Sequence, residues 1–354
     1  MKVTFNMSTR NIALVVGASG IIGNAVVKTL AGHQDWQVRA LRHTSVAGVE
    51  RIDCDLAHPS EVALALRAAA DTTHVFYAAY KPAPSAASEA SVNTAMLATV
   101  LDGLKAVGAP LRRVVHYQGA KAYGAHLGEA VAPFYEDDVR HLGPNFYFDQ
   151  EDLLRERAAA GDFDWSILRP DAVVGDIGGN PLNIAVVIGA FAALSKQAGL
   201  PLRFPGSVRT YREVFGQLTD AHWLGRASLW AATSDRARNE VFNLVGEPFR
   251  WERIWKRVGA ALDMEVAAPQ PMSLSTHMPA LAAQWGALAA RHELQAIPYA
   301  KLVNWAFGDM VLNIPWDMVS DMGKIRRAGF SEAVSTEDAV VNAILSLKLN
   351  GILP

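Results

Sequence analysis

The sequence predicts an α/β fold of the Rossmann type, a doubly wound parallel sheet with a smaller C-terminal lobe for substrate binding or a lid. Three observations predict it. An apolar run at residues 12–16 ends in a glycine turn and continues with apolar residues at helical spacing. Apolar strand-like segments then alternate with helical stretches, which indicates a parallel sheet covered on both faces. The 354 residues suffice for about two domains.

The first strand, turn and helix carry a glycine pattern. Residues 11–30, NIALVVGASGIIGNAVVKTL, place Gly17, Gly20 and Gly23 between an apolar run and a helical pattern. In a dinucleotide fingerprint the first glycine permits the turn and the second lets the backbone approach a pyrophosphate. The third lets helix and strand pack closely, while the helix N-terminus faces the phosphates. The glycines alone are a weak signal, and the flanking strand and helix strengthen it.

Five further strands complete the predicted sheet. They are expected at residues 36–42, 49–56, 73–80, 112–119 and 164–170. Ligands of such sheets bind outside the carboxyl ends of the strands, so we expect the site there.

The domain boundary is expected near residue 180. Residues 10–180 would form an NADP-binding domain. Residues 181–354 would form mainly a substrate-binding or lid lobe, with segments that return to the sheet. Within that lobe, 181–194 is expected to be a buried helix, and 251–262 has an apolar stripe typical of core packing.

The end of the second strand indicates which dinucleotide is bound. An acidic residue there would hold the ribose diol of NAD, but the chain offers Arg39, Arg42 and His43, with no carboxylate before Glu50. Because arginine suits a ribose 2′-phosphate, NADPH is favoured over NADH. Surface arginines on a loop are the alternative.

Composition and charge argue against several functional classes. The formal net charge is -2, and no long basic run occurs, so we expect no nucleic-acid partner and no membrane partner. No apolar stretch is long enough to span a bilayer, and no secretion signal is apparent.

The single cysteine, Cys54, fits a buried thiol in a reducing compartment, and we expect a cytoplasmic protein. No histidine or cysteine spacing indicates a metal site.

Segments along most of the chain resemble one known family. They are GASGIIGN, THVFYAAY, GAKAYG, PNFYFDQEDLL, WSILRPDAVVG, LRFPGS, RNEVFN and FRWERIWKRVG. Together they are similar to the progesterone 5β-reductase/iridoid synthase-like family of atypical extended short-chain dehydrogenases. The resemblance implies NADPH-dependent reduction of the carbon–carbon double bond of enones or enals, in which the carbonyl oxygen is held while an enolate forms.

The resemblance also implies two groups that hold this oxygen, a lysine and a tyrosine. Lys121 matches the lysine, but Phe148 stands at the tyrosine position and Tyr147 precedes it. Adjacent side chains point in different directions, so Tyr147 cannot simply replace its neighbour. Tyr123 is a further candidate, because a strand would place it on the same face as Lys121. A packing role for Tyr123 and a surface position for Lys121 are the alternatives.

The remaining expected site residues surround the cofactor. Asp55 and Leu56 would flank the adenine, unless Asp55 is a plain turn residue, and the resemblance puts Pro170 and Val173 against the nicotinamide. Glu151 and Asp152 are expected to complement a helix dipole rather than to act as acid and base. The full expected cofactor-binding set is Gly17, Ser19, Gly20, Ile21, Ile22, Gly23, Arg42, His43, Asp55, Leu56, Ala79, Tyr80, Pro170 and Val173.

We therefore expect an NADPH-dependent reductase of activated double bonds, with Lys121 as the principal donor and Tyr147 or Tyr123 assisting. The expected partner is a small hydrophobic carbonyl compound, and a homodimer is the assembly considered. Two alternatives stay open. One is a carbonyl reductase or alcohol dehydrogenase of hydrophobic substrates, and the other is a non-catalytic NADP(H)-sensing protein.

Overall fold

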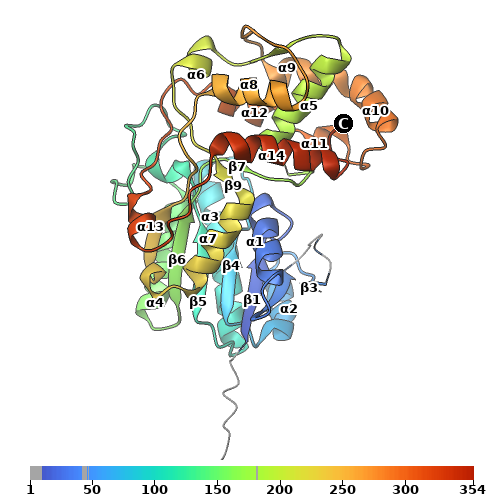
Figure 1. Ribbon diagram of the computed structural model, residues 1–354. Coiled ribbons are helices and arrows are strands. Elements are labelled where there is room, and N and C mark those ends of the chain that lie inside the picture. The colour runs from blue at the N-terminus through green and yellow to red at the C-terminus, as the bar shows by residue number, and fades with distance from the viewer. Residues whose placement is uncertain (1–9, 42–45, 47, 181) are drawn as a thin grey trace, which may run out of the picture. The chain divides into compact units, whose positions relative to one another are not determined.

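The computed structural model describes residues 10–41, 46, 48–180 and 182–354 (Figure 1). These residues form two compact units, which interleave along the chain. The sheet unit comprises Met1–Gln118, Leu142–Leu168 and Gly225–Val241, and the helical unit comprises Gly119–His141, Arg169–Leu224 and Phe242–Pro354. The domain boundary expected at residue 180 stays a prediction.

The sheet has seven strands. In chain order they are β1 (Asn11–Val16), β2 (Trp36–Leu41), β3 (Glu50–Ile52), β4 (His74–Tyr77), β5 (Arg113–Tyr117), β6 (Asp164–Arg169) and β10 (Glu240–Asn243). Their order across the sheet is β10-β6-β5-β4-β1-β2-β3, and the pairs from β3 to β6 are parallel. The strand order reverses between β1 and β4, which is the point where open α/β sheets bind ligands. The predicted Rossmann-type fold is confirmed.

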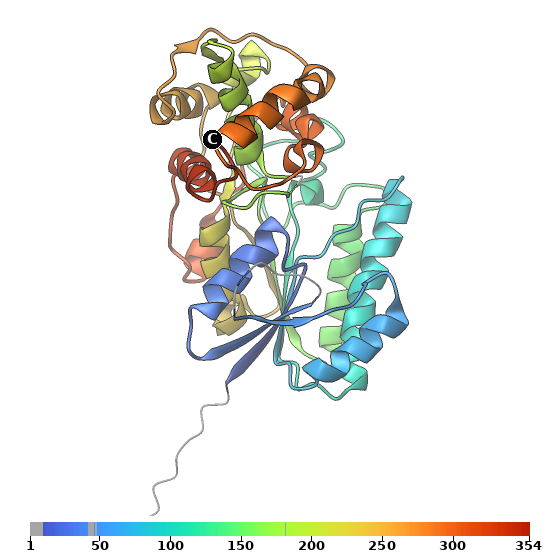
Figure 2. The ribbon, with the colours of Figure 1, turned by 90° about the vertical axis from the view of Figure 1, so that its right-hand side faces the viewer.

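Helices cover both faces of this sheet. Figure 2 shows α1 (Ile21–Ala31) and α7 (Ala221–Thr233) on one face, and α2 (Pro59–Ala65), α3 (Ala86–Ala106) and α4 (Phe146–Ala159) on the other. Gly225 lets α7 approach α1, since a Cβ there would lie 2.2 Å from Thr29 Oγ1. The core between the sheet and α2, α3 and α4 is apolar, with Leu97, Val114 and Leu154 fully or almost fully buried.

The helical unit is built on four main helices, α5 (Ile184–Gln197), α8 (Trp251–Ala261), α12 (Trp305–Leu312) and α14 (Thr336–Leu349). The buried helix predicted from residue 181 is confirmed as α5, which begins after the capping residue Asn183, and Pro181 lies outside the described residues. The predicted stripe on α8 is also confirmed, because Trp251, Ile254, Trp255 and Val258 are buried.

Short elements complete the structure. They are β7 (Val173–Val174), β8 (Leu202–Arg203), β9 (Thr219–Asp220), β11 (Val266–Ala267), α6 (Val208–Arg212), α9 (Leu274–His277), α10 (Ala282–Arg291), α11 (Tyr299–Leu302), α13 (Gly323–Arg327), and the 3-10 helices η1 (Leu66–Ala69), η2 (Ala120–Tyr123), η3 (Asp235–Ala237) and η4 (Met278–Leu281). No helix within the described ranges is long and apolar enough to cross a bilayer.

Three local expectations were wrong. Cys54 lies beyond the end of the short strand β3 and is half-buried, rather than buried in a strand. Helix α4 begins at Phe146, where the Asn145 side chain caps it by accepting the Tyr147 N–H over 3.0 Å, so Glu151 and Asp152 lie beyond the first turn that a dipole role requires. Lys121 and Tyr123 stand in the 3-10 helix η2 and not on a strand.

Candidate active site

The turn after β1 has no room for a side chain. Gly17 has φ +85°, a conformation that favours glycine. A Cβ on Gly17 would also lie 2.7 Å from the backbone of Ala78 and Ala79, which follow β4. The turn therefore packs directly against the neighbouring strand end, at the point where the strand order reverses.

The N-terminus of α1 suits an anion. Gly20 is the N-cap residue, its N–H bonds to the Gly17 oxygen over 3.0 Å, and a Cβ on Gly23 would lie 2.2 Å from that same oxygen. The first turn, whose residues are all described, carries no acidic side chain. Ser19 is exposed, Ile21 is buried and Ile22 is partly buried. These features fit a dinucleotide pyrophosphate, which would be held by backbone N–H groups.

Arg39 forms ion pairs within the protein, whereas in the sequence it is a candidate for binding a ribose 2′-phosphate. Its guanidinium bonds to Glu50 Oε2 over 2.7 Å and to the Asp71 carboxylate. The Asp71 bond is the main cause that raises the pKa of Arg39, with burial acting in the opposite direction. Arg39 is therefore committed to ion pairs with Glu50 of β3 and with Asp71, which precedes β4. Arg42 and His43, the other residues expected to select NADPH, lie outside the described residues.

Asp55 and Leu56, the two residues expected to flank the adenine, have different surroundings: Asp55 forms a turn and Leu56 packs in the core. Asp55 accepts the Ala57 N–H over 3.0 Å and lies 3.5 Å from His58 Nδ1, as the turn alternative predicts. Leu56 is buried in the core.

Ala79 and Tyr80 follow β4, next to the glycine turn. Ala79 is partly buried. Tyr80 is exposed, donates its hydroxyl hydrogen bond to Glu89, and lies 5.4 Å from Phe146 between ring centroids. Their roles in cofactor binding stay predictions.

Lys121 stands in η2, in the helical unit, three residues after Gln118, where a segment of the sheet unit ends. Its backbone oxygen accepts the Gly124 N–H over 3.2 Å and lies 3.3 Å from His141 Nε2. A 3-10 helix has about three residues per turn, so Lys121 and Tyr123 point in different directions. The expectation that they share one face is therefore wrong.

The Tyr123 hydroxyl is held by two buried side chains. It donates to Asn243 Oδ1 and accepts from Arg169 Nη1 over 3.2 Å. Its ring stacks on Phe134, with the centroids 5.0 Å apart. Burial raises the pKa of Tyr123 to about 12, with Arg169 acting in the opposite direction, so the phenol stays protonated at neutral pH.

The aromatic pair Tyr147 and Phe148 occupies the first turn of α4, in the sheet unit. Phe148 is buried and Tyr147 is partly exposed. Gln118 donates from Nε2 to the Tyr147 backbone oxygen over 2.9 Å. Because consecutive helical residues point about 100° apart, the two side chains do not occupy the same place.

Glu151 and Asp152 do not lie in the first turn of α4, so they do not complement its N-terminal dipole as expected. Glu151 is buried, in the second turn of α4, and forms an ion pair with Arg155 over 2.8 Å. Asp152 is exposed, and the acidic residue of the first turn is Asp149. Glu151 therefore has a structural partner within its own helix.

The turn after β6 contains Pro170, which is buried, and leads to Val173, which pairs with Thr219 of β9. Asp171 caps this turn, because its Oδ1 accepts the Ala172 N–H over 2.7 Å. Burial raises the pKa of Asp171 to about 6, and the Ala172 bond acts in the opposite direction.

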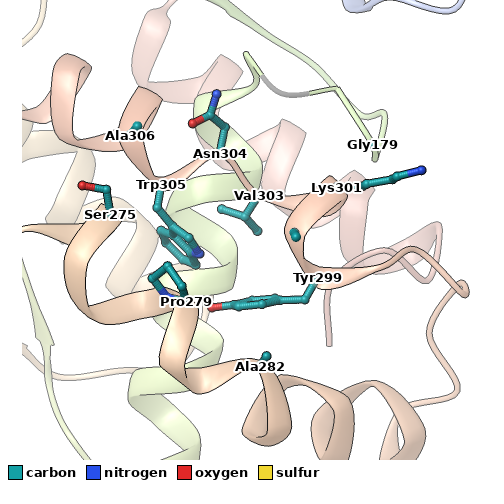
Figure 3. A pocket seen from close by; sticks show the side chains of 11 residues that line it. Gly179, Ser275, Pro279, Ala282, Tyr299, Lys301, Val303, Asn304, Trp305 and Ala306 are labelled. Atoms are coloured by element: carbon teal, nitrogen blue, oxygen red, sulfur yellow. The ribbon is translucent and has the colours of Figure 1, made fainter.

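The helical unit also contains a cavity of about 640 Å³ that sequence reasoning missed (Figure 3). Trp305, Pro279 and Tyr299 form its apolar wall, and Figure 3 shows their rings close together. Lys301 and Asn304 add polar groups. The Tyr299 hydroxyl donates to the Met278 oxygen over 2.9 Å, which fixes the phenol against that wall. The lining comes from several short helices, so no local sequence pattern indicated it.

Comparisons with known proteins show which sequences this chain resembles. The model of the PRISE-like Rossmann-fold domain matches residues 34–354. The 3-oxo-Delta(4,5)-steroid 5-beta-reductase of Arabidopsis thaliana is 28% identical over 99% of this chain and 95% of its own. The (S)-8-oxocitronellyl enol synthase CYC2 of Camptotheca acuminata is 26% identical over 98% of this chain and 94% of its own.

A solved structure shows a similar fold. It is a short-chain dehydrogenase/reductase superfamily protein from Agrobacterium tumefaciens with bound NAD. It covers 96% of this chain and 97% of its own, with a TM-score of 0.64 and 18% identity.

Proposed function

This chain belongs to the PRISE-like Rossmann-fold family, and from that premise we propose that it is an NADPH-dependent reductase of activated carbon–carbon double bonds. Membership confirms the resemblance found in the sequence, because the relatives include a steroid 5β-reductase and an enol synthase matched over nearly the whole chain. The chain is an oxidoreductase of the short-chain dehydrogenase/reductase superfamily.

One observation carries the proposal. Lys121 lies on the turn η2, just beyond the carboxyl end of β5, in a chain that matches a 3-oxo-Δ4,5-steroid reductase almost end to end. The carboxyl ends of parallel strands are where such sheets bind ligands. A lysine ammonium there can stabilise negative charge on a substrate oxygen.

The chemistry divides between the cofactor and the chain. When bound, the nicotinamide supplies a hydride. An enone would accept this hydride at its β-carbon, which would leave negative charge on the carbonyl oxygen as an enolate. The Lys121 ammonium stabilises the enolate oxygen electrostatically, and a proton from water at the α-carbon then gives the saturated carbonyl compound. With Phe148 in place of the second donor, Tyr147 is proposed to assist from its own position in the first turn of α4, which is not that of the lost phenol.

We propose a nicotinamide dinucleotide as the cofactor, and NADPH rather than NADH. A nicotinamide dinucleotide is supported by the glycine turn, by the bare N-terminus of α1 and by the bound NAD of the related structure. NADPH in particular is supported by Arg42 and His43 in the sequence and by the absence of a carboxylate before Glu50.

The proposed substrate is a small hydrophobic carbonyl compound. The cavity of about 640 Å³ lies within the usual range of ligand pockets, roughly 300–1,000 Å³. Its wall of Trp305, Pro279 and Tyr299 suits an apolar body rather than a sugar nucleotide.

A second candidate function is a non-catalytic NADP(H)-sensing protein. The observation that favours it is Phe148, which puts a buried ring where the family implies a phenol. Loss of one oxyanion donor typically slows a reaction by about 10² to 10³ without abolishing it, so reduction remains the better proposal.

The experiment that tests the function uses the purified full chain with NADPH or NADH. The probes are progesterone, as a 3-oxo-Δ4 steroid, and an α,β-unsaturated aldehyde. We expect slow oxidation of NADPH in preference to NADH, with the saturated carbonyl compound as product. An allylic alcohol as sole product would instead establish a carbonyl reductase. Binding of NADPH without any turnover of either probe would establish the sensor.

A further inference from the structure

We propose that Tyr123 is a positioning residue: its hydroxyl holds the turn that carries Lys121 and does not itself donate to the substrate. The proposal rests on the proposed function for what Lys121 does, and it concerns how Lys121 is held. All of the residues that carry it belong to the helical unit.

The first argument is that the Tyr123 hydroxyl already donates its one hydrogen bond, to the Asn243 side chain. Asn243 is fully buried, and its Nδ2 donates to the backbone oxygens of Phe134, over 3.0 Å, and Asp321, over 3.1 Å. These two acceptors fix the amide, so Oδ1 faces the phenol as an acceptor. Tyr123 therefore donates to Asn243, and donation to a substrate would leave the buried Oδ1 without this partner.

The second argument is that the network continues beyond the phenol. The Asn243 N–H donates to Glu136 Oε1 over 2.8 Å. The buried Arg169 donates from Nη1 to the Tyr123 hydroxyl over 3.2 Å and to the Glu136 backbone oxygen over 3.3 Å. The phenol thus joins η2 to the end of β6, the end of β10 and the segment around Glu136, all of them buried or partly buried.

The third argument concerns the turn itself. The Ala122 N–H bonds to the Gly119 oxygen over 2.9 Å, and the Gly124 N–H bonds to the Lys121 oxygen. These bonds, together with the Ala125 N–H bond to the Ala120 oxygen over 3.4 Å, hold η2, which is only four residues long, and such short helices have little stability of their own. The Tyr123 side chain is the group at the end of this turn that reaches a buried network, whereas Lys121 points in another direction. Loss of the hydroxyl should loosen the turn and move the ammonium.

The first experiment measures the lysine rather than turnover. Each variant of the full chain is treated briefly with a succinimidyl ester, which acylates amines, and acylation of every lysine is followed by mass spectrometry. We expect Tyr123→Phe to raise the acylation rate of Lys121 by about three-fold or more, because a looser turn opens more often. The exposed Lys105 and Lys256 serve as internal references and should keep their rates.

A matched control and a second variant accompany it. Tyr117→Phe removes another buried phenol, which donates to Ser228 Oγ over 2.8 Å in the sheet unit, and should leave Lys121 acylation unchanged. Glu136→Ala removes the acceptor of the Asn243 N–H without altering Tyr123, and should raise Lys121 acylation as Tyr123→Phe does. This second variant keeps the test available if Tyr123→Phe does not fold.

The second experiment is a double-mutant cycle on kcat with Tyr123→Phe and Lys121→Met. If Tyr123 acts through Lys121, Tyr123→Phe lowers kcat by about 10-fold to 100-fold in the native chain, with the KM for NADPH unchanged. It then has no further effect when Lys121 is already methionine.

Two results would overturn the proposal. One is an unchanged acylation rate of Lys121 in both Tyr123→Phe and Glu136→Ala. The other is an equal loss of kcat from Tyr123→Phe in both backgrounds, which would make Tyr123 an independent donor. Acylation needs no turnover, so failure of the proposed reductase activity is seen separately, as a wild-type chain that reduces neither probe.

Discussion

Gln118 donates a hydrogen bond from its side-chain Nε2 to the backbone oxygen of Tyr147, over 2.9 Å. The same nitrogen lies 3.2 Å from Glu151 Oε2, and Glu151 is in turn paired with Arg155. Gln118 directly follows β5 and Tyr147 stands in the first turn of α4. A single buried amide thus ties the end of a central strand to the turn that presents Tyr147 and Phe148.

Gln118→Leu should therefore destabilise the fold. The substitution keeps much of the volume but leaves the Glu151 carboxylate without one buried donor, so we expect the free energy of unfolding to fall by about 1–3 kcal/mol. Urea denaturation measures it. The control is Gln295→Leu, which removes a similar amide-to-backbone bond at an exposed side chain. If the free energy of unfolding fell equally in the two variants, the buried hydrogen bonds of Gln118 would contribute no more to stability than the exposed bond of Gln295.

Gly17→Ala should weaken cofactor binding. The added methyl would lie 2.7 Å from the backbone of Ala78 and Ala79 and would strain a residue at φ +85°. We expect the affinity for NADPH to fall by at least about 10-fold, because the turn that faces the pyrophosphate must move. Fluorescence titration with NADPH measures it.

Gly161→Ala provides the matched control. Gly161 has φ +82°, and apart from its two chain neighbours no described residue comes within 4 Å of its Cβ position. The change should cost about 1 kcal/mol of stability through backbone strain alone. Unchanged NADPH affinity in both variants would mean that Gly17 does not shape the cofactor site.

Phe148→Tyr should restore the missing donor. If the position is the one that the family uses, the phenol would add a second hydrogen bond to the enolate oxygen, and kcat should rise by about 10² to 10³. Steady-state turnover of the enone measures it. Phe163→Tyr, which adds a hydroxyl to another buried ring, is the control. A stability loss with no gain in kcat would place the Phe148 ring in the core and away from the substrate.

His116 should make the fold sensitive to acid. Burial lowers its pKa to about 4 from an ordinary 6.5, while the Tyr77 carbonyl, Glu151 and Gln150 act in the opposite direction. As the pH falls from 6.5 to 4, the unfolded chain takes up this proton before the folded protein does, so stability declines in that window. The full effect is on the order of 3–4 kcal/mol.

His116→Gln tests this pH dependence by difference. The free energy of unfolding, measured with urea at several pH values, should fall less steeply with acid in the variant than in the native chain. His277→Gln, at an exposed histidine, is the control. The same slope in the native chain and His116→Gln would contradict the buried, neutral state of His116.

Much of the fold could be predicted because its signals are local. The strand, the glycine turn and the helix around Gly17 occupy consecutive residues, and the alternation of strands and helices fixes a parallel sheet. The apolar stripe of α8 follows from spacing alone. These features depend on near neighbours in the sequence.

The site could be predicted less well because it depends on distant residues. Tyr123 is held by Asn243, 120 residues away, and by Arg169, 46 residues away, and neither partner is visible in the local pattern GAKAYG. An apolar run followed by glycine is compatible with a strand or a turn, and tertiary contacts favoured the 3-10 helix η2. The cavity lined by Trp305 likewise gathers side chains from several helices.

The most direct test of the account is Lys121→Met, since every proposed step depends on an ammonium that stabilises the enolate oxygen. We measure kcat for reduction of an enone together with the dissociation constant for NADPH, and Lys256→Met, at an exposed lysine, is the control. The account predicts that kcat falls by about 10² to 10³ while NADPH binding is unchanged. Turnover equal to that of the native chain would contradict it.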